Sequence, residues 1–365
     1  MDHWILTQAL GRGKAVEDRF ERLTFTRLVD TVAGYPRGSV VLPDGSIVSG
    51  YPSIARVQSL AAGLRRHYSG PFWAEEKIDG FNVRIVRYGQ THYAFSRGGF
   101  VCPFSTDRLP DLMDPAVFDE DPQLVLCAEI AGPENPYLEG HPPQVAEDVA
   151  LFAFDMMHRA RPGFVSQDDK MRLIARYGLP ATRIFGRYQP EDTEPLQQLI
   201  LQLDAEGSEG LVFKGEEDGS RAKYVTGRSN VSDIALCGDQ LLDLPPEYFT
   251  NRLLRLALFA SENGQVGDAE LERSLGRAFI AGVARAVERS REVGRVGVPF
   301  RCRFRQRRNA EHFIAHMKAT GGKRIMIAED MPRREGRYWV LEFERVLERM
   351  TGTLANTLAG ASQYD

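Results

Sequence analysis

The sequence predicts an α+β fold of mainly antiparallel sheets with flanking helices, followed by a helical region. From Phe72 onward, short strand-like segments are separated by turns. In one of them, Phe81, Val83 and Ile85 alternate with polar residues, which is the period of two expected of a strand with one buried face. After about Ser232 the apolar residues change to helical spacing. Strands interrupted by only occasional helices indicate antiparallel sheets.

The length of 365 residues is enough for more than one compact unit. We place segment boundaries at residues 1–69, 70–237, 238–296 and 297–365. A hydrophobic content of 43% and a charged content of 26% are ordinary for a globular protein. No apolar run approaches the roughly 18 residues that a membrane span needs, and the first residues lack the basic and apolar pattern of a signal peptide.

The four cysteines are far apart and form no CxxC pair. Each lies among apolar or strand-like neighbours, so four buried thiols are favoured over a zinc site. With the absence of a membrane span or signal peptide, this pattern predicts a cytoplasmic protein. The cysteines are Cys102, Cys127, Cys237 and Cys302.

In the first segment we expect a helix over Val16–Leu28 and Gly- and Pro-marked turns after it. In the second, Ser166 and Asp169 form a capping box for a helix that ends near Gly178. Another helix begins at Thr193 and ends at Gly207. Further strands are expected at Thr91–Arg97, Leu124–Ile130, Val149–Met156, Gly210–Lys214 and Arg221–Val225.

The third segment carries two helical patterns, Leu241–Phe259 and Asp268–Arg291. The last segment opens with a strand in which Phe300, Cys302 and Phe304 share one face. A helix, a turn at Gly321-Gly322, further strands and a final helix follow. We therefore expect a small α/β unit at the C-terminal end of the chain.

A net charge of −4 argues against a nucleic-acid binder that is basic throughout. Arginines nevertheless gather between 285 and 308, and Arg301, Arg303 and Arg305 share one strand face. This stripe fits binding to RNA phosphates. It fits equally well a charged edge that prevents sheets from aggregating.

Lys77-Ile78-Asp79-Gly80 is the sharpest local motif. By itself it fits a β-turn with a solvated lysine beside it, and chance matches to so short a motif are frequent.

The order of the motifs that follow it changes this interpretation. Six stretches in order resemble the motifs of the covalent nucleotidyltransferases, which are ATP-dependent ligases and messenger-RNA capping enzymes. They are Lys77-Ile78-Asp79-Gly80, Ser96-Arg97-Gly98-Gly99, Leu126-Cys127-Ala128-Glu129, Phe152-Ala153-Phe154-Asp155, Glu209-Gly210-Leu211-Val212-Phe213-Lys214 and Arg221-Ala222-Lys223.

The longer strings EEKIDGFNVRI, SRGGFVCPF, LCAEIAGPENPY and YWVLEFERV resemble the archaeal-type, homodimeric RNA ligases that circularise RNA. The resemblance covers nearly the whole chain and is weakest in the first sixty residues. It implies a nucleotidyltransferase (ATP-grasp-like ligase) catalytic domain at 70–237, a helical dimerisation domain at 238–296 and a C-terminal domain at 297–365. One departure is Arg221, where the family usually has a lysine.

The resemblance implies joining of RNA 5′-phosphate and 3′-hydroxyl ends through lysyl-AMP and RNA-adenylate, with ATP and Mg²⁺ (or Mn²⁺). A DNA ligase or a capping-type transferase is the first alternative. Both carry an OB-fold with an Arg-x-Asp-Lys type motif, and no such string follows Val225. The second alternative is a non-catalytic RNA-binding dimer with a decayed site, which the intact motif residues argue against.

Lys77 is expected to be the nucleophile, and an ammonium has no lone pair to attack with. Because a free lysine has a pKa near 10.4, the site should lower that value through burial, Mg²⁺ and nearby cations such as Arg97, Lys214 and Lys223. Asp79 should hold the turn and the amine. Lys223 should act catalytically at the α-phosphate.

The resemblance gives nine candidate ATP-binding residues: Glu76, Lys77, Asn82, Arg97, Glu129, Phe154, Glu209, Lys214 and Lys223. Phe154, rather than Phe152, is expected to stack on adenine. Glu129 and Glu209 accept hydrogen bonds when ionised, which suits ribose hydroxyls or the water shell of a metal ion.

The helical patterns of 238–296 expose more apolar residues than one helical pair can bury, among them Leu253, Leu258, Phe279 and Ile280. They lie between two units that we expect to fold alone. We therefore expect a homodimer with identical patches facing each other. The alternative is a helical linker packed wholly on its own catalytic domain.

Overall fold

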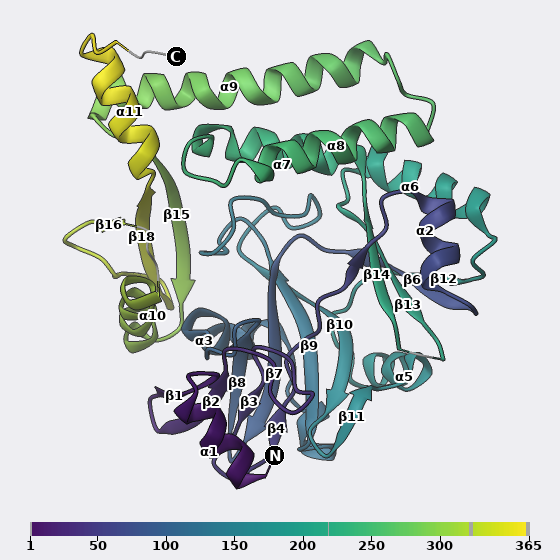
Figure 1. The fold of residues 1–365 in the computed structure, drawn as a ribbon. Coiled ribbons are helices and arrows are strands. Elements are labelled where there is room, and N and C mark those ends of the chain that lie inside the picture. Colours follow the sequence, from purple (N-terminus) through teal and green to yellow (C-terminus); the bar gives the residue numbers. More distant parts are fainter. Residues whose placement is uncertain (1, 218, 321–323, 363–365) are drawn as a thin grey trace.

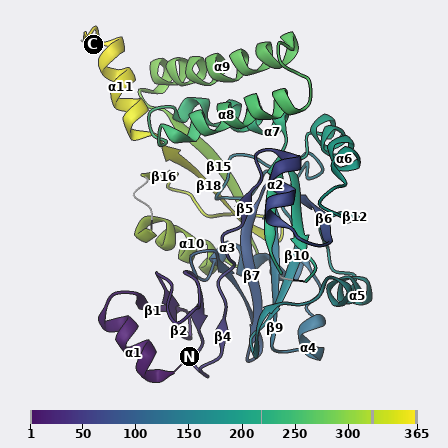
Figure 2. The ribbon, with the colours of Figure 1, turned by 45° about the vertical axis from the view of Figure 1, so that its right-hand side comes forward.

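The computed structural model of the protein describes residues 2–217, 219–320 and 324–362. The expected Gly321-Gly322 turn lies outside them. Figure 1 shows the catalytic sheets in the centre, the N-terminal unit below them, the helical unit above and the C-terminal unit to one side. Turning the molecule leaves this vertical order unchanged (Figure 2).

The N-terminal unit is helix α1 (His3–Gly11) and a four-stranded sheet. Its strands are β1 (Ala15–Phe20), β2 (Leu23–Leu28), β3 (Val40–Val41) and β4 (Ile47–Val48). The expected helix over Val16–Leu28 is therefore wrong, because this stretch forms the β1–β2 hairpin. The β-branched and aromatic residues of Thr24–Thr26 favour a strand, and Phe25 is buried beneath it.

Two five-stranded sheets form the catalytic unit. The first has the order β11-β10-β9-β7-β8, and the second has the order β12-β6-β13-β14-β5. All pairs within them are antiparallel except β14 with β5. The strands are β5 (Ala55–Arg56), β6 (Phe72–Lys77), β7 (Phe81–Tyr88), β8 (Thr91–Ser96), β9 (Leu124–Ala131), β10 (Ala150–His158), β11 (Arg161–Phe164), β12 (Ile184–Tyr188), β13 (Gly210–Gly215) and β14 (Arg221–Val225).

Helices α2 (Leu60–His67), α3 (Pro103–Leu112), α4 (Val117–Glu120), α5 (Gln167–Tyr177) and α6 (Thr193–Glu206) flank these sheets. The three predicted caps are confirmed, since the Ser166 side chain accepts from the Asp169 amide and Gly178 and Gly207 end their helices in the left-handed conformation. Strand β5 comes from residues before 70, so the first segment contributes directly to a catalytic sheet.

The helical unit consists of α7 (Gly227–Cys237), the short 3₁₀ helix η1 (Gly238–Gln240), α8 (Glu247–Glu262) and α9 (Ala269–Val293). Helix α9 lies outermost, with α7 and α8 between it and the sheets (Figures 1 and 2). The predicted start of α9 is confirmed, because the Asp268 side chain accepts from the amides of Glu270 and Leu271.

The C-terminal unit contains β15 (Gly297–Phe304), α10 (Arg307–Thr320), β16 (Ile325–Ile327), β17 (Arg333–Glu335), β18 (Tyr338–Val346) and α11 (Glu348–Leu358). As predicted, Phe300, Cys302 and Phe304 are buried on one face of β15. They belong to the same apolar cluster as Val83 and Phe104 of the catalytic unit. The two units therefore share a core, and independent folding of the C-terminal unit stays a prediction.

All four cysteines are free and buried, as predicted. Within the described ranges, no helix combines the length and the apolar character that crossing a bilayer requires. The α+β fold class is confirmed.

Candidate active site

Lys77 is the last residue of β6, and its ammonium contacts the carboxylate of Glu209, the residue before the neighbouring strand β13. Its Nζ donates to Glu209 Oε2 at 2.5 Å, and both side chains are less than one-fifth exposed. The two meet because Gly210, next to Glu209, pairs with Lys77 across β13 and β6. The sequence motifs Lys77-x-Asp-Gly and Glu209-Gly therefore form one site.

The expected lowering of the Lys77 pKa is not what this structure shows. Burial disfavours the ammonium, but Glu209, Glu129 and Asp79 outweigh burial and raise the pKa of Lys77. Of the cations we expected to oppose them, Lys214 is engaged by Glu75 and Asp155, and Lys223 does not outweigh the acidic groups. Lys77 is therefore a stable ammonium until the negative charge around it is neutralised.

The crowding of acidic groups around Lys77 also disfavours the ionised forms of Glu129 and Asp79. Burial, together with the charge of Glu209, raises the pKa of Glu129 to about 8 and that of Asp79 to about 7. Asp79 is not among the residues that line the pocket beside Lys77. Its Oδ2 lies 3.0 Å from the position that a Cβ on Gly140 would take. An excess of carboxylates over cations is a suitable environment for a divalent metal ion.

Two glycines allow this close packing. A Cβ on Gly80 would lie 2.6 Å from Glu129 Cγ, so the turn after Lys77 could not approach β9. Gly210 has a φ of 148° and a Cβ there would lie 2.1 Å from the Tyr224 carbonyl oxygen. Both motif glycines are thus required by the close approach of neighbouring strands.

A single pocket collects eight of the nine predicted ATP-binding residues. The ninth, Glu209, joins them through Lys77. The lining residues are Tyr51, Pro52, Ile54, Glu75, Glu76, Lys77, Ile78, Asn82, Arg97, Glu129, Phe154, Thr182, Val212, Lys214 and Lys223. Sequence reasoning missed Tyr51, Pro52 and Ile54, which precede every motif that the resemblance identified.

Phe154 faces this pocket because β10 contains a bulge. Phe152 pairs with Glu129 and Asp155 pairs with Cys127, which leaves Phe154 without a partner on β9. A bulge redirects the side chain of its extra residue. Phe152 lines a different pocket. The bulge therefore places Phe154 at the nucleotide pocket and Phe152 away from it.

Glu76 and Asn82 differ in how their polar atoms are occupied. Glu76 accepts two hydrogen bonds from the Arg183 guanidinium, at 2.8 and 2.9 Å, so its carboxylate is already committed. Asn82 Oδ1 is buried and has no hydrogen-bond partner among the residues that the structure describes. Because Asn82 lies opposite Glu129 in the register of β7 and β9, its free oxygen adds a ligand for a cation or its water shell.

Lys214 is not available as a free phosphate-binding cation. Its Nζ lies 2.8 Å from Glu75 Oε2 and 3.3 Å from Asp155 Oδ1, and its side chain is 2% exposed. Lys170 also donates to Glu75. Burial opposes ionisation of Glu75, but Lys214 and Lys170 outweigh it and lower the Glu75 pKa. This buried network supports the wall of the pocket beside Phe154.

Lys223 has the lowered pKa that we expected for Lys77. Burial, Arg56 and Lys77 reduce the pKa of Lys223 to about 8. Lys223 lies beside Arg56, its partner in the parallel pair of β14 and β5. Arg97, at the exposed rim, contributes further positive charge and contacts Ser53 at 3.5 Å. Phosphate groups therefore have a cationic side of the pocket to bind to.

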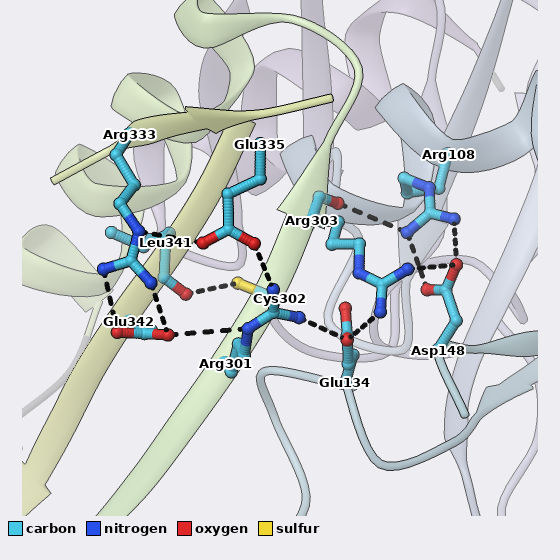
Figure 3. A network of polar contacts seen from close by, with 10 residues as sticks. All are labelled: Arg108, Glu134, Asp148, Arg301, Cys302, Arg303, Arg333, Glu335, Leu341 and Glu342. Atoms are coloured by element: carbon cyan, nitrogen blue, oxygen red, sulfur yellow. Dashed lines mark hydrogen bonds and ion pairs between the residues drawn. The ribbon is translucent and has the colours of Figure 1, made fainter. Parts of the chain in front are cut away.

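The arginine stripe of β15 is engaged in ion pairs (Figure 3). Arg301 contacts Glu134 and Glu335, each at 2.6 Å, and Arg303 contacts Glu134 at 2.7 Å. Arg305 lies 3.6 Å from Asp111. The contacts with Glu134 and Asp111 join the C-terminal unit to the catalytic unit. Binding of RNA phosphates by the stripe would first have to break these ion pairs.

Comparison with known proteins agrees with this geometry. A sequence profile of RNA ligase matches residues 70–225, and one of the C-terminal region of ligase Pab1020 matches residues 239–361. An uncharacterised protein of Methanocaldococcus jannaschii is 24% identical over 322 residues, which are 86% of this chain and 82% of that protein.

Two solved proteins match over nearly the whole length. One, from Aquifex aeolicus and provisionally described as an ATP-dependent DNA ligase, is 43% identical, covers 100% of both chains and has a TM-score of 0.94. The other, an archaeal ATP-dependent RNA ligase solved in two forms, is 25% identical, covers 98% of this chain and 96% of that one, and has a TM-score of 0.88.

The fold and the pocket around Lys77 define a nucleotidyltransferase-type ligase. The chain belongs to the RNA ligase family. The resemblance noted from its motifs is confirmed.

Proposed function

We propose that the protein is an ATP-dependent RNA ligase that joins a 5′-phosphate to a 3′-hydroxyl in three steps. Lys77 attacks the α-phosphorus of ATP, and the P–O bond to pyrophosphate breaks as the P–N bond forms. The AMP then passes to the RNA 5′-phosphate. Finally the RNA 3′-hydroxyl attacks that phosphate and releases AMP. The observation that carries the proposal is one pocket holding Lys77, Glu129, Phe154 and Lys223.

The residues present fit a divalent metal ion, for which we propose Mg²⁺, with Mn²⁺ as a substitute. Among the described residues no three His, Cys, Asp or Glu side chains are grouped to hold a metal by themselves. Glu129 and Glu209, with the unpartnered Asn82 Oδ1, would instead hold it together with phosphate oxygens and water. When bound, the ion supplies positive charge at the phosphates.

The first step requires that the negative charge of the carboxylates around Lys77 be neutralised, because this charge stabilises the unreactive ammonium. The Lys77 ammonium must lose a proton before it can attack, and in the ligand-free state Glu209 stabilises the ammonium by accepting a hydrogen bond from it. Glu209 can accept the proton or be drawn away by a cation. Lys223 balances charge that develops on the α-phosphate oxygens. Phe154 positions adenine by stacking.

The experiment that tests the function starts with labelled ATP or GTP, followed by denaturing electrophoresis of the protein. We expect label from ATP only. The labelled protein is then offered 5′-phosphorylated RNA or DNA of the same sequence. Transfer to RNA and sealing of its ends support the proposal. Equal or preferred sealing of DNA would favour the alternative raised by the Aquifex aeolicus relative, and the absence of any label would favour a non-catalytic binder.

We further propose that the protein is a homodimer formed through the helical unit. The exposed apolar residues Leu254 on α8 and Ile280 on α9 are 54% and 72% exposed. Scattered exposed apolar side chains are normal, but several on one helical unit indicate an interface.

Single-stranded RNA is the proposed substrate, with its own two ends sealed into a circle. The cytoplasm stays our predicted location.

A further inference from the structure

Three cations lie together at the edge of the nucleotide pocket. They are Lys223 on β14, Arg56 on β5 and Arg255 on α8. Among the described residues, none of the three forms an ion pair. Arg56 Nη1 is also buried, with no hydrogen-bond partner in the described part of the chain. A buried guanidinium nitrogen left unpaired is costly, so this atom favours binding of an anion.

The positions of the three residues follow from the sheet and from α8. The pairings of β6, β13, β14 and β5 place Glu75, Val212, Lys223 and Arg56 in one row across the sheet. Residues of one row point to one face. Glu75 and Val212 line the nucleotide pocket and Arg56 does not. Arg56 therefore continues the row beyond Lys223, at the edge of the sheet.

Helix α8 brings Arg255 to this edge. Glu262 of α8 accepts a hydrogen bond from Tyr224 at 2.9 Å and one from the Leu60 amide at 2.6 Å. These contacts dock the helix against β14 and α2. Arg255 precedes Phe259 by four residues, and Phe259 is buried in the core of the same sheet. Positions four apart share a helix face, so Arg255 faces the catalytic unit.

The charges around Arg255 indicate that the positive charge of Arg56, Arg255 and Lys223 is not balanced by ion pairs among the described residues. Burial, Arg56 and Arg252 lower the pKa of Arg255 to about 10. Arg252 itself is paired with Asp233 at 2.7 Å, and Glu209 is paired with Lys77. The nearby carboxylates are thus already occupied, and repulsion remains between Arg56 and each of Arg255 and Lys223. A phosphate group would relieve it.

We propose that Arg56, Arg255 and Lys223 form a phosphate subsite between the catalytic sheet and α8, which holds the 5′-phosphate of the RNA strand that receives AMP. This proposal rests on the function proposed above. Lys223 lines the nucleotide pocket, whereas Arg56 and Arg255 lie outside its lining, at the boundary between two units, where the end of a polymer can enter. Through Lys223 the subsite is near Lys77, which the second step requires. In that step an oxygen of the 5′-phosphate attacks the α-phosphorus, the P–N bond to Lys77 breaks, and the released amine takes up a proton.

The test compares two steps in the same protein preparations. Arg56→Gln and Arg255→Gln are compared with wild type and with Arg277→Gln, a control on the exposed face of α9. Lysyl-AMP formation from ATP is one arm. The other is transfer of AMP from preloaded protein to 5′-phosphorylated RNA without added ATP. Loss of one charge-assisted hydrogen bond should slow transfer about tenfold or more, and by a larger factor than it slows lysyl-AMP formation. Arg255→Lys should retain part of the transfer rate.

A binding measurement gives a readout independent of turnover. The wild type should bind 5′-phosphorylated RNA more tightly than 5′-hydroxyl RNA, and Arg56→Gln and Arg255→Gln should reduce that preference. Wild-type transfer and preference in both variants would overturn the proposal. So would a loss confined to lysyl-AMP formation, which would assign the site to the terminal phosphates of ATP. A wild-type protein that neither labels nor transfers would instead refute the proposed function.

Discussion

Replacing Glu129 with glutamine should inactivate the protein and at the same time stabilise its ligand-free form at alkaline pH. In the folded protein, burial and the neighbouring Glu209 raise the pKa of Glu129 from 4.5 to about 8. The folded protein therefore keeps a proton that the unfolded chain releases near its ordinary pKa. Stability then falls as the pH rises between these two values. Glutamine has no proton to lose and escapes that decline.

The size of the effect follows from the width of the pH window. Between pH 5.5 and 8.0, each unit of pH changes the free energy of unfolding by at most about 1.4 kcal/mol for one proton, so the full window gives about 3 kcal/mol as an upper value. Glu129 borders a pocket open to solvent, and water screens part of this cost. We expect about 1 kcal/mol of relative stabilisation, or an apparent Tm shift of about 2–4 °C.

The assay is thermal unfolding of wild type and Glu129→Gln at pH 5.5 and 8.0, without nucleotide. The control is Glu272→Gln, an exposed change on α9, which should track wild type at both pH values. AMP labelling of Glu129→Gln should be lost in parallel. A Tm difference between Glu129→Gln and wild type that is the same at both pH values would refute the electrostatic reasoning. Full AMP labelling would refute the catalytic assignment.

Four further outcomes test the site and the assembly. Lys77→Ala should abolish AMP labelling yet still seal RNA that is already adenylylated, and labelling at the wild-type level would contradict its role as nucleophile. Lys223→Ala should slow labelling at saturating ATP by roughly 10²-fold or more, and a change in ATP affinity alone would assign it to ground-state binding. Phe154→Ala should raise the KM for ATP about fivefold through lost stacking, whereas Phe152→Ala, in a different pocket, should not. Ile280→Asp should halve the mass measured by light scattering, from twice 40.9 kDa; a wild type that is already monomeric and fully active would exclude the dimer.

Features that depend on short stretches of chain were predictable. The strand carrying Phe81, the capped helix after Ser166 and the long helix after Asp268 each have their signal within a few residues. The motif order likewise identified the residues of the nucleotide pocket. The β1–β2 hairpin was mistaken for a helix because its turn contains Glu21 with a φ of 51° and no glycine or asparagine, so the usual turn signal is missing.

The sequence by itself determined which residues form the site and the class of chemistry, because those depend on residue type and order. Only the tertiary structure decided the protonation and the ion pairing of their side chains. Lys77 keeps its proton because strand pairing brings Glu209 against it, and Lys214 is neutralised because Glu75 and Asp155 are buried beside it. The Arg301 stripe pairs with Glu134 rather than standing free. A charged group's behaviour depends on its neighbours in space and on its burial, and neither can be read from positions far apart in the chain.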